Sequence, residues 1–236
     1  VRGHTVAQVN IAFENETIPG EALSSEELGL LDRQLFGILA PPDLPLLNQL
    51  FRDNLEAIHG AAAVAKLNLN ASYGGIAPSD SEFGMGLIRP GHVLRTTGGT
   101  EAPLNTWSFT FTVDTDYWVG QGTNNTTAIN IDKRACVFPL AVAWTQGVRP
   151  QTEELYFQIG GTTYPVQIIR HGWLADNDAM VRFARVRLGV WAPKQTVLGQ
   201  VQSIAAGPQE LVMLGLTFGT GQFLRLQTPA AVQTYP

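Results

Sequence analysis

The chain has a single cysteine, few charged residues and no long apolar run. One cysteine, Cys136, cannot form a disulfide within the chain, so a disulfide-stapled scaffold is excluded. Cys136 begins the apolar run of residues 136–140, which predicts a buried thiol that packs as a small hydrophobic side chain. No run reaches the roughly 18 apolar residues that a membrane-spanning helix needs, and residues 1–4 do not begin a signal-peptide hydrophobic region.

Charged residues form 15% of the chain, against about a quarter in an average globular protein. The net charge is −5, which argues against sequence-independent nucleic-acid binding over the whole surface, because such binding needs a basic footprint. Uncharged polar residues, with Gly and Pro, therefore make up much of the surface. Such a surface suits burial against identical neighbours or ligands, and it is also ordinary in all-β proteins.

Alternating side chains predict that the second half of the chain, residues 106–227, is rich in strands. In residues 106–113, Trp, two Phe and Val alternate with Thr and Ser. Because side chains alternate across a strand, this pattern predicts one buried face and one polar face. Further strands are predicted over residues 128–131, 136–144, 155–159, 163–170, 180–191, 196–204, 211–218 and 223–227.

Glycines, prolines and a change of phase mark irregular places in this strand block. Gly160 and Gly161 lie between two alternating runs and indicate a β-hairpin. Pro139 and Pro165 interrupt strand-like runs, which places those strands at sheet edges or bulges. Near Ala184 the apolar positions change phase, which predicts a β-bulge or a strand buried on both faces.

The chain before residue 106 predicts an arm, two helices and loops. Residues 5–13 alternate and indicate a strand, or an arm that becomes a strand by pairing with a neighbour. Ser24 and Glu27 match a capping box, and the apolar spacing after them predicts a helix over residues 25–39. Residues 68–103 are rich in glycine turns and are expected to be irregular, as an inter-subunit loop or a ligand loop.

A second helix is predicted after residue 42. Asp43 is its expected N-cap, and Pro45 is tolerated in its first turn. Its expected buried stripe consists of Leu47, Phe51, Leu55, Ile58, Ala62 and Ala65.

The order of these elements indicates a mainly β protein, an antiparallel β-sandwich or jelly roll with an N-terminal helical extension. We expect residues 1–105 to supply the arm, two helices and glycine-rich loops packed on the core. Residues 106–236 are expected to form the β-sandwich core. No internal repeat or low-complexity linker is present, so the two parts are expected to form one domain.

No motif for catalysis, cofactor binding or metal binding stands out. The four histidines, at positions 4, 59, 92 and 171, have no metal-ligand spacing. Residues 114–116 and 176–178 are acidic turns that could offer oxygens to calcium, although Asp and Asn are also common in tight turns. Residues 84–86 and 219–221 lack the helix and the Lys-Ser/Thr pair of a phosphate loop and are interpreted as turn glycines. We therefore predict no catalytic residue, no cofactor and no metal, and expect a protein that is not an enzyme.

Five arginines form the one concentration of cations in the sequence: Arg170, Arg182, Arg185, Arg187 and Arg225. On antiparallel neighbours some of them would line one face. Such a face could contact an acidic neighbouring subunit, lipid headgroups or nucleic acid. The alternative is a solvated strand face with ion pairs to Glu or Asp.

In its strand-like arm, glycine-rich loops, sparse charge and strand block, the chain resembles the jelly-roll major capsid proteins of icosahedral viruses, including tailless viruses that contain a membrane. The resemblance lies in overall organisation, mainly over residues 106–227. It implies a structural virion protein that assembles with itself into an icosahedral shell in the host cytoplasm. A second capsid subunit and an internal membrane are further partners left open, and no specific nucleic-acid binding is expected.

Two other functions stay open. A carbohydrate-binding β-sandwich module, lectin-like or an adhesin, would work outside the cell and would stack sugars on exposed tryptophans. Its candidate residues are Trp118, Trp144, Trp173 and Trp191, for which core packing is the other fate. A glycoside hydrolase is the third hypothesis, because its two carboxylates meet only in the folded protein.

Overall fold

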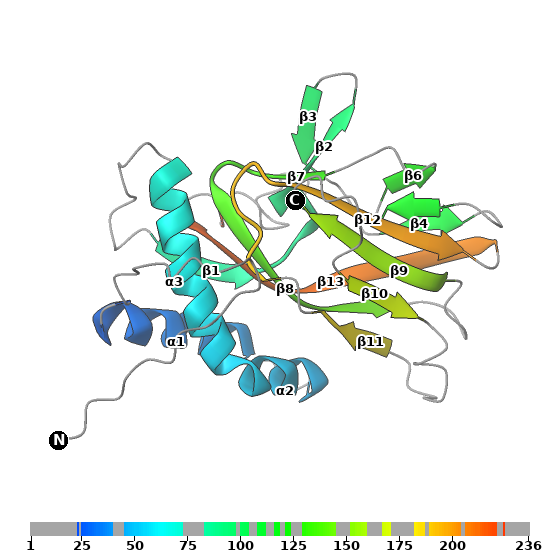
Figure 1. Ribbon diagram of the computed structural model, residues 1–236. Coiled ribbons are helices and arrows are strands. Elements are labelled where there is room, and N and C mark those ends of the chain that lie inside the picture. Colours follow the sequence, from blue (N-terminus) through cyan, green and yellow to red (C-terminus); the bar gives the residue numbers. More distant parts are fainter. Residues whose placement is uncertain are drawn as a thin grey trace, which may run out of the picture.

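The fold is known from a computed structural model of the chain (Figure 1). It describes residues 23, 25–39, 45–72, 83–97, 100–103, 108–111, 116–118, 121–123, 129–144, 152–159, 167–170, 182–186, 189–203, 206–220 and 224. Within these residues, α-helices come first and two antiparallel sheets follow. The predicted arm of residues 5–13 lies outside the described residues, as does all of 223–227 except Leu224.

The helices are α1 (Ser25–Leu39), α2 (Pro45–Asp53) and α3 (Leu55–Ser72). The first predicted helix is therefore confirmed. Two glutamates in its first turn, Glu26 and Glu27, suit the positive end of the helix dipole. The second predicted helix is divided into α2 and α3 at Asn54, so the prediction of one continuous helix is wrong.

Asn54 divides the helices because its amide competes with the helical hydrogen bonds. Its side-chain Nδ2 donates to the Leu50 carbonyl at 2.7 Å, and its backbone N–H donates to the Phe51 carbonyl at 3.2 Å. The Asn54 carbonyl in turn accepts from the Ile58 N–H at 2.9 Å and begins α3. A single residue thus satisfies the end of one helix and the start of the next.

The predicted buried stripe of this region is confirmed at four of its six residues, and the side chain of Leu47 lies outside the described ones. Phe51, Ile58, Ala62 and Ala65 are all buried. Leu55 is 40% exposed, so its predicted burial is wrong. The break at Asn54 makes Leu55 the first residue of α3, where it no longer follows the phase of α2.

The first sheet has the strand order β1-β13-β8-β11, and β4 pairs with the early part of β13. Its strands are β1 (Phe83–Leu87), β4 (Ser108–Phe111), β8 (Ala135–Trp144), β11 (Arg182–Arg185) and β13 (Gly207–Thr220). All of the pairings are antiparallel. The predicted strands at residues 106–113, 136–144 and 211–218 are therefore confirmed in position.

The second sheet has the strand order β10-β9-β12-β7-β2-β3, and β5 pairs with β12 and β6. Its strands are β2 (Val93–Thr97), β3 (Thr100–Pro103), β5 (Asp116–Trp118), β6 (Gln121–Thr123), β7 (Ile129–Ile131), β9 (Thr152–Ile159), β10 (Gln167–Arg170) and β12 (Thr196–Ser203). The short helix η1 (Pro90–His92) leads into β2. Since β9 and β10 pair antiparallel, the hairpin predicted from the glycines between them is confirmed in its partners. Neither sheet closes into a barrel in the described part of the chain.

Residues 83–103 were expected to be irregular, yet they form β1, β2 and β3. The expectation is wrong because the glycines of β1 hide its alternation. Gly84 and Gly86 are strand residues rather than turn glycines, and Gly84 pairs with Gly219 of β13. A side chain at Gly84 would meet the Gln34 amide at 3.1 Å, so this glycine lets α1 approach the strand.

Strand β8 lies between β13 and β11, so of the two positions predicted for Pro139, a sheet edge or a bulge, the structure shows the bulge. Leu214 pairs with Ala141, whereas Gly215 pairs with Pro139, which leaves Leu140 as the extra residue. Leu140 and Ala141 both belong to the apolar cluster beneath the helices. Pro165 lies outside the described residues.

The predicted irregularity near Ala184 occurs later in the chain. Ala184 itself pairs in register with Val142. Arg185 pairs with Ala141 and Trp191 with Val137, so six steps along one side match four along the other. The two extra residues lie after Arg185, in a segment where Gly189 has a φ of 66°.

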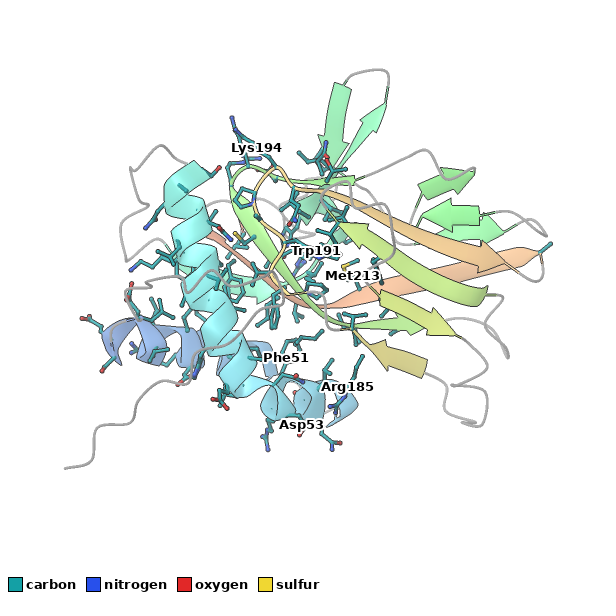
Figure 2. The ribbon with its side chains drawn as sticks, in the orientation of Figure 1. Phe51, Asp53, Arg185, Trp191, Lys194 and Met213 are labelled. Carbon is teal, nitrogen blue, oxygen red and sulfur yellow. The ribbon has the colours of Figure 1, made fainter. Side chains whose placement is uncertain are left out.

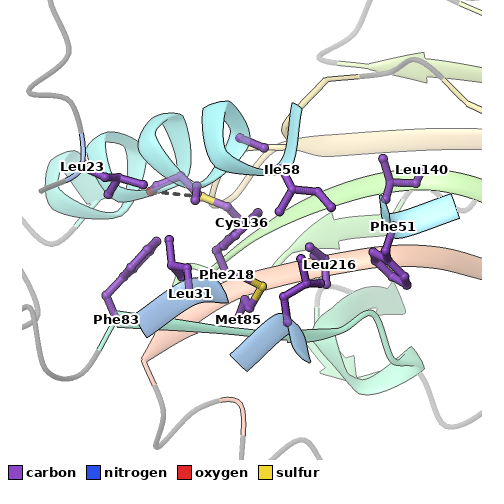
Figure 3. Close-up of a cluster of buried hydrophobic side chains, with 14 of the residues drawn as sticks. Leu23, Leu31, Phe51, Ile58, Phe83, Met85, Cys136, Leu140, Leu216 and Phe218 are labelled. Atoms are coloured by element: carbon purple, nitrogen blue, oxygen red, sulfur yellow. Dashed lines mark hydrogen bonds between the residues drawn. The ribbon is translucent and has the colours of Figure 1, made fainter. Parts of the chain in front are cut away.

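The helices cover one face of the first sheet and enclose an apolar cluster with it (Figure 3). The sheet contributes side chains such as Cys136, Leu216 and Phe218, and the helices contribute others such as Phe51 and Ile58. The rings of Phe83 and Phe218 stack within this cluster at 6.2 Å between centroids. None of the described helices is long and apolar enough to cross a membrane.

A second group of buried side chains joins the two sheets. Trp191 bridges to β8, because its N–H and carbonyl bond to Val137 at 2.7 and 3.0 Å. Its fully buried ring packs on Phe157 of β9, with 6.1 Å between ring centroids. Val142 and Met213 of the first sheet and Val197 of the second are also buried. Figure 2 labels Trp191 and Met213 of this group.

Candidate functional site

The predicted arginine group divides between the two sheets. Arg170 ends β10 in the second sheet, whereas Arg182 and Arg185 lie in β11 of the first. Arg187 and Arg225 lie outside the described residues. That these arginines contact an anionic partner stays a prediction.

Arg185 contacts the end of α2 (Figure 2). Its Nη2 donates to Asp53 Oδ2 at 2.9 Å, and both side chains are well exposed. The pair links the edge strand β11 to the helices. An exposed pair of this kind contributes at most about 1 kcal/mol. For this one arginine, the structure therefore shows the alternative of an ion pair within the chain.

Of the four histidines, His59 and His92 are described. His59 Nε2 lies 2.7 Å from Asp32 Oδ1 and joins α3 to α1. Lys66 of α3 forms a second ion pair with Glu27 of α1. These pairs fasten the two helices side by side. Among the described residues, no group of three or more His, Cys, Asp or Glu side chains could hold a metal ion.

His92 is buried in η1, just before β2. Its Nδ1 accepts from the Arg89 N–H at 3.3 Å and lies 2.9 Å from the Thr217 hydroxyl. Because Nδ1 is the acceptor for Arg89, the Thr217 hydroxyl is the donor. The pKa of His92 is lowered from 6.5 to about 3, first by burial and then by the charge of Arg89, against a smaller opposing effect of Asp132. The imidazole is therefore neutral at physiological pH.

The structure describes three of the four tryptophans proposed for sugar stacking, and also the cysteine predicted to be buried. Trp191 is fully buried and offers no face to a sugar. Trp118 and Trp144 lie in β5 and β8, and Trp173 lies outside the described residues. Cys136 is fully buried, as predicted, and its Sγ donates to the Ala65 carbonyl at 3.6 Å.

The turn between β7 and β8 is organised by Asp132. Its carboxylate accepts from the Arg134 backbone N–H at 2.8 Å, from Nε at 2.9 Å and from Nη2 at 2.8 Å. Burial tends to raise the pKa of Asp132, but the hydrogen bonds and charge of Arg134, together with the charge of Lys133, outweigh it and hold this pKa below its usual value. The turn is thus rigid, and its central residue, Lys133, is exposed.

A neighbouring turn before β12 carries a second lysine. The Lys194 N–H donates to the Ile131 carbonyl at 3.0 Å, and the Ile131 N–H donates to the Gln195 carbonyl at 3.0 Å. Lys194 has a φ of 61°, and its side chain is exposed. Figure 2 labels Lys194, whose side chain extends away from the ribbon.

We define the turn surface as Lys133, Arg134 and Lys194. Two of the three lysines of the chain lie on it. Neither Lys133 nor Lys194 forms an ion pair with a carboxylate in the described part of the chain. The Ser72 hydroxyl at the end of α3 donates to the Lys133 carbonyl at 3.1 Å, so the negative end of that helix lies beside the surface.

The turn surface could not be predicted from the sequence. Lys133 and Lys194 lie 61 positions apart, and each looks like a single cation in a turn. The adjacent pair Lys133-Arg134 was the one local signal. Comparison with known proteins adds nothing to this site, because no family model, curated protein or solved structure matches the chain.

Proposed function

We propose that this protein is a structural subunit that assembles with copies of itself into a closed shell, in the manner of the jelly-roll capsid proteins that its organisation resembles. Its strands form a sandwich in this proposal, with the helices as an outer layer on one sheet. The contact between Trp191 and Phe157 supports a sandwich, because it joins a residue bridged to β8 with a strand of the other sheet.

The observation that carries the proposal is the use of the buried polar side chains. His92 and Thr217 bond to each other across the two sheets, and Asp132 holds its own turn through Arg134. These three are the buried polar or charged residues among those described. Each serves to fix the fold, which favours a rigid building block over a reactive site. The low charged fraction, 15%, suits surfaces that become buried against neighbours.

The test is the assembly state of the purified chain, measured by analytical ultracentrifugation and negative-stain electron microscopy over a range of concentration and salt. Closed shells or regular arrays are the expected result. A chain that stays monomeric under every condition would contradict the proposal. Binding of a monomer to a glycan array would then support the carbohydrate-binding alternative. Glycan hydrolysis that is lost on substitution of one Asp or Glu would support the hydrolase.

A further inference from the structure

We propose that the turn surface docks on the helices of a second copy of this chain. The inference rests on the proposed function and names one contact of the assembly. Lys133 and Lys194 are exposed cations on two hydrogen-bonded turns, and neither forms an ion pair with a described carboxylate, although the charge of Lys133 acts on the buried Asp132 beside it. An acidic partner would satisfy both of them.

The chain itself is such a partner. Its net charge is −5, so the part outside the turn surface, which carries +3, has a net charge of −8. On the helices, Glu26 and Glu56 are exposed, and neither forms an ion pair with another described residue. We call these two residues the helix carboxylates. The remaining described acidic residues of the helices each have a cationic or histidine partner; they are Glu27, Asp32 and Asp53.

Distance prevents Glu56 from meeting the lysines of its own copy. Glu56 lies in the first turn of α3, and the last residue of that helix, Ser72, contacts the backbone of Lys133. Sixteen residues of helix between them span about 24 Å. Attraction between exposed charges is largely screened beyond about 10 Å at ordinary salt. Only another molecule can therefore bring Glu56 to the turn surface.

The resulting contact joins two different surfaces, one on each copy. Such a heterologous contact repeats from copy to copy and closes into rings when its rotation permits. The positive turn surface would meet the helices near Glu56, where the α2–α3 corner of the neighbour is exposed. An association of this type weakens as salt rises, because the charges are exposed in the separate copies.

Charge reversal tests this contact in the full-length chain. Lys133→Glu with Lys194→Glu should weaken self-association at least tenfold by sedimentation, at a salt concentration where the unchanged protein assembles. The matched control is Arg33→Glu, at an exposed cation of α1 away from the α2–α3 corner, compared with Lys133→Glu alone, which changes the net charge equally. It should not weaken association. Circular dichroism and thermal unfolding check that each variant folds, and Lys133→Gln with Lys194→Gln replaces the reversal if it does not.

Charge exchange identifies the partner surface. Glu26→Lys with Glu56→Lys should also weaken self-association, because lysines would then face lysines. Mixing these copies with the Lys133→Glu, Lys194→Glu copies places opposite charges at every alternating contact, so association of unlike copies should recover. Failure of the mixture to recover, or normal assembly of the lysine variant, overturns the contact while leaving shell assembly intact. A native chain that never assembles overturns the proposed function together with it. Loss of binding to anionic vesicles or to polyphosphate by the lysine variant, without a change in assembly, would assign the surface to another partner and also overturn the contact.

Discussion

The Nδ1 atom of His92 lies 2.9 Å from the hydroxyl oxygen of Thr217, 125 residues later in the chain. The bond joins η1, which leads into the second sheet, to β13 of the first. Both side chains are buried. A neutral imidazole can accept the hydroxyl proton, whereas a protonated ring would place a charge in the interior. This contact between the two sheets is therefore expected to weaken when the imidazole is protonated.

We expect the stability of the protein to fall in mild acid because of His92. Its pKa is about 3 in the folded protein and 6.5 when unfolded. Above pH 6.5 both states are neutral and no penalty exists. Below pH 6.5 His92 binds a proton in the unfolded state but stays neutral in the folded state. The free energy of unfolding therefore falls by about 1.4 kcal/mol per pH unit until the pH reaches the folded pKa.

Urea unfolding of the native chain and of His92→Asn between pH 7 and 5 measures this effect. The asparagine oxygen can accept the Thr217 hydroxyl proton without titrating. The difference between the two curves isolates His92, because the other histidines contribute to both. Parallel curves would show that His92 does not govern the acid sensitivity.

Gly215 is the position where we expect the addition of a single methyl group to destabilise the folded protein most. A Cβ there would lie 2.2 Å from the Phe138 carbonyl oxygen and 2.9 Å from Pro139 Cα, at the bulge of β8. Both are main-chain atoms of a central strand, and the φ of 156° adds strain for any side chain. We expect Gly215→Ala to lower the free energy of unfolding by about 3 kcal/mol or more, or to prevent folding.

The matched control for Gly215 is Gly86→Ala in strand β1 of the same sheet. Its Cβ would meet only Leu224 Cδ2, at an ordinary 3.9 Å. Soluble yield and the midpoint of urea unfolding compare the two variants. Equal midpoints for Gly215→Ala and Gly86→Ala would contradict the close approach at the bulge.

Patterns within one element could be predicted from the sequence, whereas features that depend on a distant partner could not. The helix over Ser25–Leu39 was predicted because capping and apolar spacing are local. Strand β1 was missed because Gly84, which makes room for Gln34 about fifty residues earlier, interrupts its alternation of side chains. The break at Asn54 was missed because an amide fits a helix interior or a cap equally well by composition.

The candidate site was harder to predict for the same reason. The arginines that lie close together in the sequence are divided between the two sheets. Lys133 and Lys194, by contrast, are brought together by backbone hydrogen bonds around Ile131. The burial of Asp132, which fixes the turn, is set by the packing of the sheets. Charge spacing along a chain says little about which strands become neighbours.

Gln34 covers the outer edge of strand β1. Its Oε1 accepts from the Met85 N–H at 2.9 Å, so a backbone donor that faces away from β13 is satisfied by α1. We expect Gln34→Ala to lose about 1 kcal/mol of stability. It should also aggregate faster, because an unpaired edge strand recruits other chains. Gln49→Ala, at an exposed position of α2, is the control.

A double-mutant cycle with Gly84→Ala sharpens this prediction. The added Cβ would press on the Gln34 amide at 3.1 and 3.2 Å, so Gly84→Ala should destabilise the native chain. The same change should cost less once Gln34→Ala has removed the amide. Additive effects in urea unfolding would show that the two positions do not contact each other.

Cys136 can report whether the helices open separately from the sheets. Its thiol is fully buried beneath α3, and burial raises its pKa far above the usual value. Both features should make it inert to alkylating reagents in the folded protein. Helices and first sheet share one apolar cluster, so we expect them to open together, in a single cooperative unit. The free energy of opening from thiol labelling should then match that from urea unfolding within about 1 kcal/mol, with Cys136→Ala as the unlabelled control. Labelling that is much faster would mean that α3 lifts from β8 while the sheets stay folded.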